Sequence, residues 1–146
     1  MQNFIINNQV LDDIYKNAHI ALQSISNLIA DVDDIDLKNE LLSQYEGYEN
    51  IIKEASSIMD ENNITKKDIN PMKKAMLFTS IKLKTITGAD KNKVADMMIQ
   101  GTNMGIIQLT TIKNDKNKNL DEKVDKLLSD FIALEETYLN NLKKFL

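Results

Sequence analysis

Apolar residues recur every three or four positions along four long segments of this sequence, and this spacing constrains the fold more than any other feature. Such a period places the apolar side chains on one face of an α-helix. It predicts long helices at about 8–31, 35–61, 89–113 and 120–145, and a shorter helix at about 71–87. The 146 residues include one proline and four glycines, the two residue types that most disfavour helix interiors. The sequence therefore predicts an all-α fold.

Each long helix carries one apolar stripe, and the stripe of the last helix is close to the heptad seam of a coiled coil. The residues of the second helix predicted to face the core are Leu37, Leu41, Tyr45, Tyr48, Ile52, Ala55 and Met59. Those of the last helix are Val124, Leu127, Phe131, Leu134, Tyr138, Leu142 and Phe145.

Capping signals mark the starts of several helices. Asp90 is the expected N-cap of the helix at 89–113, and Asn70 with Pro71 starts the shorter helix. Asn119, followed three residues later by Glu122, resembles a capping box. The acidic run between the first two helices offers further N-caps.

Short links predict that consecutive long helices pack as antiparallel hairpins. The two hairpins, 8–61 and 89–145, are then joined by one long connection that contains the helix at 71–87. This is the ferritin-like topology. We predict a single domain over residues 1–146, a ferritin-like antiparallel four-helix bundle with a short extra crossover helix.

Three segments share their order and spacing with a known family. They are Leu11-Asp12-Asp13-Ile14-Tyr15, Asp34-Ile35-Asp36-Leu37-Lys38-Asn39-Glu40-Leu41-Leu42 and Lys82-Leu83-Lys84-Thr85-Ile86-Thr87-Gly88. On these segments, and over nearly its whole length, the chain resembles a family of uncharacterised bacterial ferritin-like bundle proteins. The resemblance implies the bundle fold.

Ferritin-like di-iron proteins hold their metal with inward-facing Glu residues and two Glu-x-x-His motifs. This chain lacks the motif. Glu46 is followed three residues later by Glu49, Glu136 is followed by Leu139, and the single histidine, His19, lies beside the apolar stripe of the first helix. We therefore expect no metal, no cofactor and no catalytic residues.

A degenerate carboxylate site with weak metal binding is the alternative. Glu46, Glu49, Glu135 and Glu136 could supply its ligands if their side chains faced inward. Glu135 adjoins Leu134 on the predicted stripe, and carboxylates beside an apolar stripe most often point to solvent. The sequence therefore favours solvent exposure of these four side chains.

The charge balance bears on possible partners. The net charge is −4, every basic residue other than the single histidine is lysine, and cysteine is absent. An acidic chain without arginine is a poor match for nucleic acid or an anionic membrane. No segment approaches the ~20 apolar residues of a membrane span. We expect no nucleic-acid partner, no membrane association and a cytoplasmic location.

Residues 97–107 form a methionine- and glycine-rich stretch, and further methionines stand at positions 59, 72 and 76. It contains Met97, Met98 and Met104 and lacks charged side chains. It lies either in the core or in an oligomer interface. Gly101 and Gly105 share a helix face and would let a neighbouring backbone approach closely. Replacing Gly101 with Leu is then predicted to overpack the bundle or disrupt an oligomer.

These observations predict a non-enzymatic bundle that acts through protein–protein contacts, as a homo-oligomer or with another protein. A spore- or stress-associated role is an analogy with other ferritin-like proteins. The alternative function is the degenerate metal site.

Overall fold

The computed structural model describes residues 2–64, 90–115 and 119–146. Within these ranges the chain is helical and contains no strand, which confirms the all-α prediction. The helices are α1 (Gln2–Leu28), the short 3₁₀ helix η1 (Ile29–Asp31), α2 (Ile35–Glu61), α4 (Lys91–Asn114) and α5 (Glu122–Lys143). The helix predicted at 71–87, with its start at Asn70 and Pro71, lies outside the described residues.

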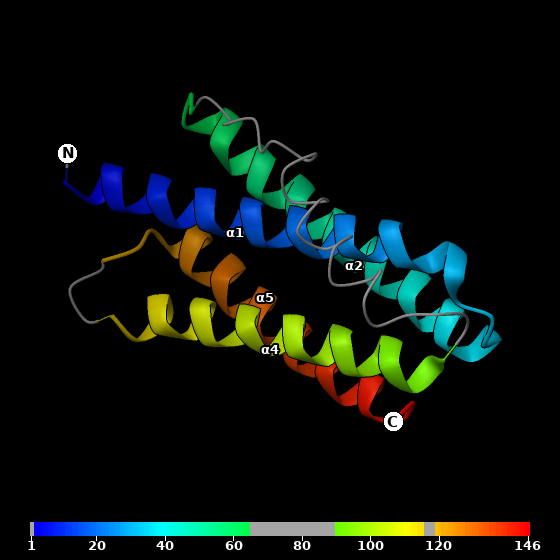
Figure 1. Cartoon of the computed structure of the whole chain (residues 1–146). Helices are drawn as coiled ribbons and strands as arrows, with labels where there is room; N and C mark the ends of the chain where they lie inside the picture. The colour runs from blue at the N-terminus through cyan, green and yellow to red at the C-terminus, as the bar shows by residue number, and fades with distance from the viewer. Residues whose placement is uncertain (1, 65–89, 116–118) are drawn as a thin grey trace.

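The four α-helices pack as two antiparallel pairs (Figure 1). α1 packs along α2, and α4 along α5, while α2 also packs on α5. α1 meets α4 over a smaller interface. Figure 1 shows that α2 and α4 run in the same direction along the bundle. The end of α2 and the start of α4 therefore lie at opposite ends of the bundle.

The capping predictions are confirmed at the starts of α2 and α4 and wrong at the start of α5. Asp34 and Asp90 are the N-caps of α2 and α4, where their carboxylates accept hydrogen bonds from backbone N–H groups at 2.9 Å and 3.1 Å. The capping box at Asn119 is wrong, because Asp121 occupies the N-cap position of α5. The N–H of Asp121 instead donates to Asn7 Oδ1 at 2.9 Å. A side chain of α1 thus holds the start of α5.

The core lies between the inward faces of all four helices, and its largest fully buried side chains include Tyr48 and Phe131. The predicted stripes of α5 and α2 need correction. On α5, Glu135 is buried, whereas Leu134 and Phe145 are only half-buried. On α2, Gln44 and Ile51 are buried, whereas Tyr45 and Ile52 are half-buried. Either set satisfies the three-and-four spacing, so the sequence pattern alone does not select between them. Among the described helices, none combines the length and apolar character needed to cross a lipid bilayer.

Candidate functional site

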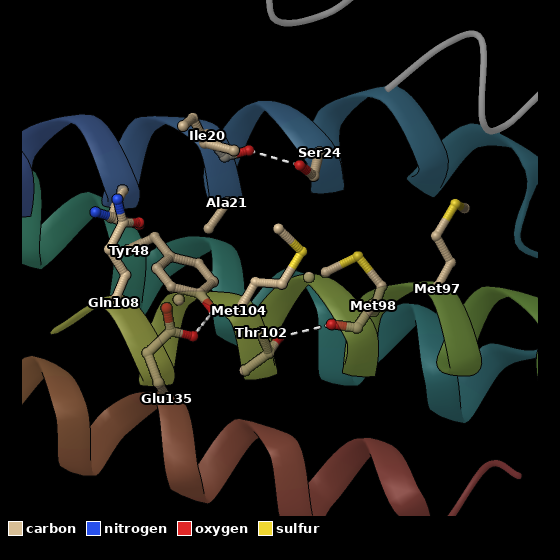
Figure 2. Close-up of a pocket in the computed structure, with 13 residues that line it drawn as sticks. Ile20, Ala21, Ser24, Tyr48, Met97, Met98, Thr102, Met104, Gln108 and Glu135 are labelled. Carbon is tan, nitrogen blue, oxygen red and sulfur yellow. Dashed lines mark hydrogen bonds between the residues drawn. The ribbon is translucent and has the colours of Figure 1, made fainter. Parts of the chain in front are cut away.

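A pocket of about 180 Å³ lies between α1 and α4, which pack over a smaller interface than either hairpin pair. Its walls are largely apolar, and three methionines of α4 line it. Figure 2 shows side chains of α1 above it and side chains of α4 below it. The described lining residues are Asn17, Ile20, Ala21, Ser24, Tyr48, Met97, Met98, Gly101, Thr102, Met104, Gly105, Gln108 and Glu135.

Tyr48 of α2 and Glu135 of α5 also reach the pocket; in Figure 2, α2 lies behind it and α5 is drawn below α4. The Tyr48 hydroxyl donates a hydrogen bond of 2.7 Å to Glu135 Oε2. Both residues are buried, with 1% and 3% of their surface exposed. The Tyr48 ring also packs edge-to-face on Phe131 and Tyr138, at centroid distances of 6.2 Å and 5.3 Å. Aromatic packing therefore fixes the donor that holds the carboxyl group.

Burial changes the acid–base properties of this pair. It raises the pKa of Glu135 to about 7, and the hydrogen bond from Tyr48 opposes the rise. Burial and the adjacent Glu135 charge raise the pKa of Tyr48 well above its usual value. Glu135 is thus a buried acid that changes charge near neutral pH, a property often found at functional sites.

Gly105 gives the Glu135 carboxyl group its space. A Cβ at position 105 would lie 2.9 Å from Glu135 Oε1 and 3.8 Å from its carboxyl carbon. Both residues border the pocket. The glycine therefore lets the α5 carboxyl group lie against the α4 backbone at the edge of the cavity.

The hydroxyl groups around the pocket donate their hydrogens within the protein. Ser24 donates to the Ile20 carbonyl oxygen at 2.6 Å, and Thr102 donates to the Met98 carbonyl oxygen at 2.7 Å. These bonds to the preceding helical turn are common for Ser and Thr in helices. The Tyr48 hydroxyl likewise donates within the protein, to Glu135. Among the described lining residues, Glu135 carries the only carboxyl group.

The sequence prediction for Glu135 was wrong, since its side chain is buried rather than turned to solvent. Glu46 and Glu136 are exposed and Glu49 is half-buried. Glu135 lies within an apolar stripe of α5. Its carboxyl group accepts a hydrogen bond from Tyr48 and lies beside Gly105, and these contacts keep the side chain inside the bundle. Across residues 2–64, 90–115 and 119–146, no three His, Asp or Glu side chains gather as a group that could hold a metal ion.

The methionine- and glycine-rich stretch divides between core and surface. Met97 and Met98 are buried, whereas Met104 is 71% exposed at the pocket rim. Gly105 is buried, whereas Gly101 is exposed and borders the pocket. Gly101 is therefore not enclosed in the core, and the effect of Leu at position 101 stays a prediction.

A signal for Glu135 was present in the sequence. The steps from Phe131 to Glu135, Tyr138 and Leu142 are four, three and four, as regular as the stripe through Leu134. Carboxyl groups beside an apolar stripe most often point to solvent, so the pattern favours the stripe through Leu134. The partner of Glu135, Tyr48, lies 87 positions away in the sequence, so no local pattern reveals the pair.

Comparison with known proteins gave no match, whether to a protein-family model, a curated protein or a solved structure. The candidate site therefore depends on its own geometry.

Proposed function

We propose that this protein is a non-enzymatic helical bundle that binds a small, mainly apolar molecule in the α1–α4 pocket. The observation that carries the proposal is the pocket itself, an apolar cavity of about 180 Å³ with one buried carboxyl group at its edge. Apolar walls with a few placed polar groups are typical of small-molecule sites. An apolar cavity of about 150 Å³ in another protein suffices to bind benzene.

The ferritin-like arrangement is part of the same proposal. Two antiparallel hairpins with α2 and α4 running in one direction support it, because a single long connection between hairpins produces that relation. In such bundles, ligand and cofactor sites are built from side chains on facing helices. The α1–α4 pocket has this position.

Thermal unfolding in the presence of toluene tests the binding function. A ligand that binds only the folded state raises the melting temperature as its concentration increases. We expect this rise in the parent protein and its loss in Ala21→Leu, since Ala21 points from α1 into the pocket (Figure 2). Ala133→Leu, on the exposed face of α5, is the matched control and should keep the response. An unchanged melting temperature in the parent contradicts the proposal.

A second candidate function is the protein–protein contact expected from the sequence, with a second copy of this chain as the partner. Between Ile99 and Ile112, every exposed residue of α4 is uncharged, and Met104 and Ile107 are 71% and 58% exposed. Depletion of charge and enrichment of methionine are typical of interface centres. An uncharged face can meet its own copy without the repulsion that an acidic chain otherwise presents.

Light scattering over a range of protein concentrations tests this second candidate. Met104→Lys should convert a dimer to a monomer without lowering the melting temperature of the isolated bundle. Thr137→Lys, on the exposed face of α5, is the control. A parent protein that is monomeric at all concentrations removes this candidate but leaves ligand binding in place. The metal-binding alternative has no comparable support from the described residues.

A further inference from the structure

The charge of the pocket restricts what it can hold. Its described lining residues include one carboxyl group, Glu135, and no lysine or histidine. Among these described residues, an anionic ligand would meet the carboxyl group with no compensating cation, which is unfavourable in an apolar environment. A cationic or hydrogen-bond-donating head group suits it.

The available hydrogen-bonding positions point the same way. The hydroxyls of Ser24, Tyr48 and Thr102 each donate to a protein acceptor. Glu135 accepts one of these bonds through Oε2, while Oε1 lies against Gly105 at the border of the cavity. The pocket thus presents a carboxyl oxygen to a ligand that brings its own donor.

Resting on the proposed ligand-binding function, we infer that the pocket selects a small apolar amine, whose ammonium group pairs with the Glu135 carboxylate. The hydrocarbon body lies among the methionines Met97, Met98 and Met104 and against Ile20 and Ala21 of α1. A volume of about 180 Å³ suits a single six-membered ring with a short aminoalkyl group. Charge-assisted hydrogen bonds in a poorly solvated site are stronger than neutral ones.

The groups facing Glu135 define its proton balance. Tyr48 of α2 and Tyr138 of α5 are phenols, and burial raises the pKa of each, to about 12 for Tyr138. Thr102 of α4 and the lining residues of α1 do not titrate. In the protein without ligand, the pKa of Glu135 is about 7. An ammonium ligand that binds below this pH must therefore displace the proton of Glu135 into solvent.

Calorimetric titration with four ring compounds tests the selectivity. The probes are benzylamine, benzyl alcohol, toluene and benzoate. We expect benzylamine to bind the parent protein about tenfold more tightly than benzyl alcohol at about pH 8, and benzoate to bind most weakly. Glu135→Gln keeps the side-chain shape and an acceptor for Tyr48, and should reduce the preference for the amine to within about threefold. Glu136→Gln, on the exposed face of the same helix, should leave it unchanged.

Repeating the benzylamine titration of the parent protein in buffers with different ionisation enthalpies gives an independent measurement. We expect release of most of one proton per bound amine at about pH 6, and much less at about pH 8. Toluene and benzyl alcohol should release none at either pH. This measurement does not depend on the folding of any variant.

The outcomes separate the two proposals. Equal affinity for benzylamine, benzyl alcohol and toluene, without proton release, would overturn the amine inference and leave apolar ligand binding intact. Tighter binding of benzoate than of benzylamine would overturn the inference in the same way. Binding by none of the probes would overturn the proposed function, and the inference with it.

Discussion

The two sides of this bundle differ in what surrounds a glycine on a helix. On the α2–α5 side, Gly47 faces Tyr138, whose hydroxyl lies where a Cβ would stand and whose Cζ atom would be 3.0 Å from it. On the α1–α4 side, Gly101 is exposed and borders the pocket. A glycine therefore permits close packing but does not produce it, because a large partner side chain must also be in register.

The difference extends to the neighbouring residues. The Tyr138 ring packs on Tyr48, which also packs on Phe131. Aromatic rings therefore fill the α2–α5 side. On the other side, Ala21 and Gly101 contribute little volume, and the flexible methionines leave a cavity. Glu135 lies at the boundary, bonded to Tyr48 and bordering the pocket.

The largest expected effect comes from this boundary residue. In the folded state the pKa of Glu135 is about 7, above the ordinary value of 4.5, so the folded protein binds a proton more tightly than the unfolded chain. The associated stability is fully present below about pH 4.5 and is lost as pH rises through about 7. At 1.36 kcal/mol per pKa unit, the loss is about 3 kcal/mol.

Urea denaturation of the parent and Glu135→Gln between about pH 4.5 and 8 measures this loss. The variant has no carboxyl group at this position, so its stability relative to the parent should increase with pH by that amount. Parallel stability curves for the two proteins would mean that Glu135 is solvated in solution. The boundary between the packed and hollow sides would then be more open than the structure shows.

A smaller effect is expected from Gly47→Ala on the packed side. The added methyl group would collide with the Tyr138 ring, and the overpacking should lower the free energy of unfolding by about 1–3 kcal/mol. In a Tyr138→Phe background the hydroxyl is gone, so the same substitution should be less damaging. Denaturation of the four proteins of this double-mutant cycle gives the coupling. Additive effects would show that Gly47 and Tyr138 are not in contact.

The smallest effect, and one of opposite sign, is expected from Gly101→Ala on the hollow side. Gly101 is exposed at the border of the pocket, and alanine is favoured over glycine in helices by about 0.5–1 kcal/mol. The variant should therefore unfold at a slightly higher urea concentration than the parent. Destabilisation comparable to that of Gly47→Ala would show that the α1–α4 side is packed as tightly as the α2–α5 side.

The sequence by itself determined the helical class and most of the helix positions. The second predicted helix, 35–61, has the observed bounds, and Asp34 and Asp90 lie at the helix starts as capping chemistry requires. These features are local, because periodicity and capping depend on residues within one or two helical turns. The local sequence did not predict the start of α5, because the N–H of Asp121 donates to Asn7, a residue of α1.

Only the tertiary structure decided which of two adjacent stripe positions faces the core and where the bundle is hollow. Gln44 and Glu135 are buried while Tyr45 and Leu134 are only half-buried, although hydrophobicity alone ranks them in the reverse order. Their burial depends on contacts between helices, such as the bond from Tyr48 to Glu135. A cavity likewise depends on the volumes of side chains on different helices at one level of the bundle, and those side chains become neighbours only when the helices have packed.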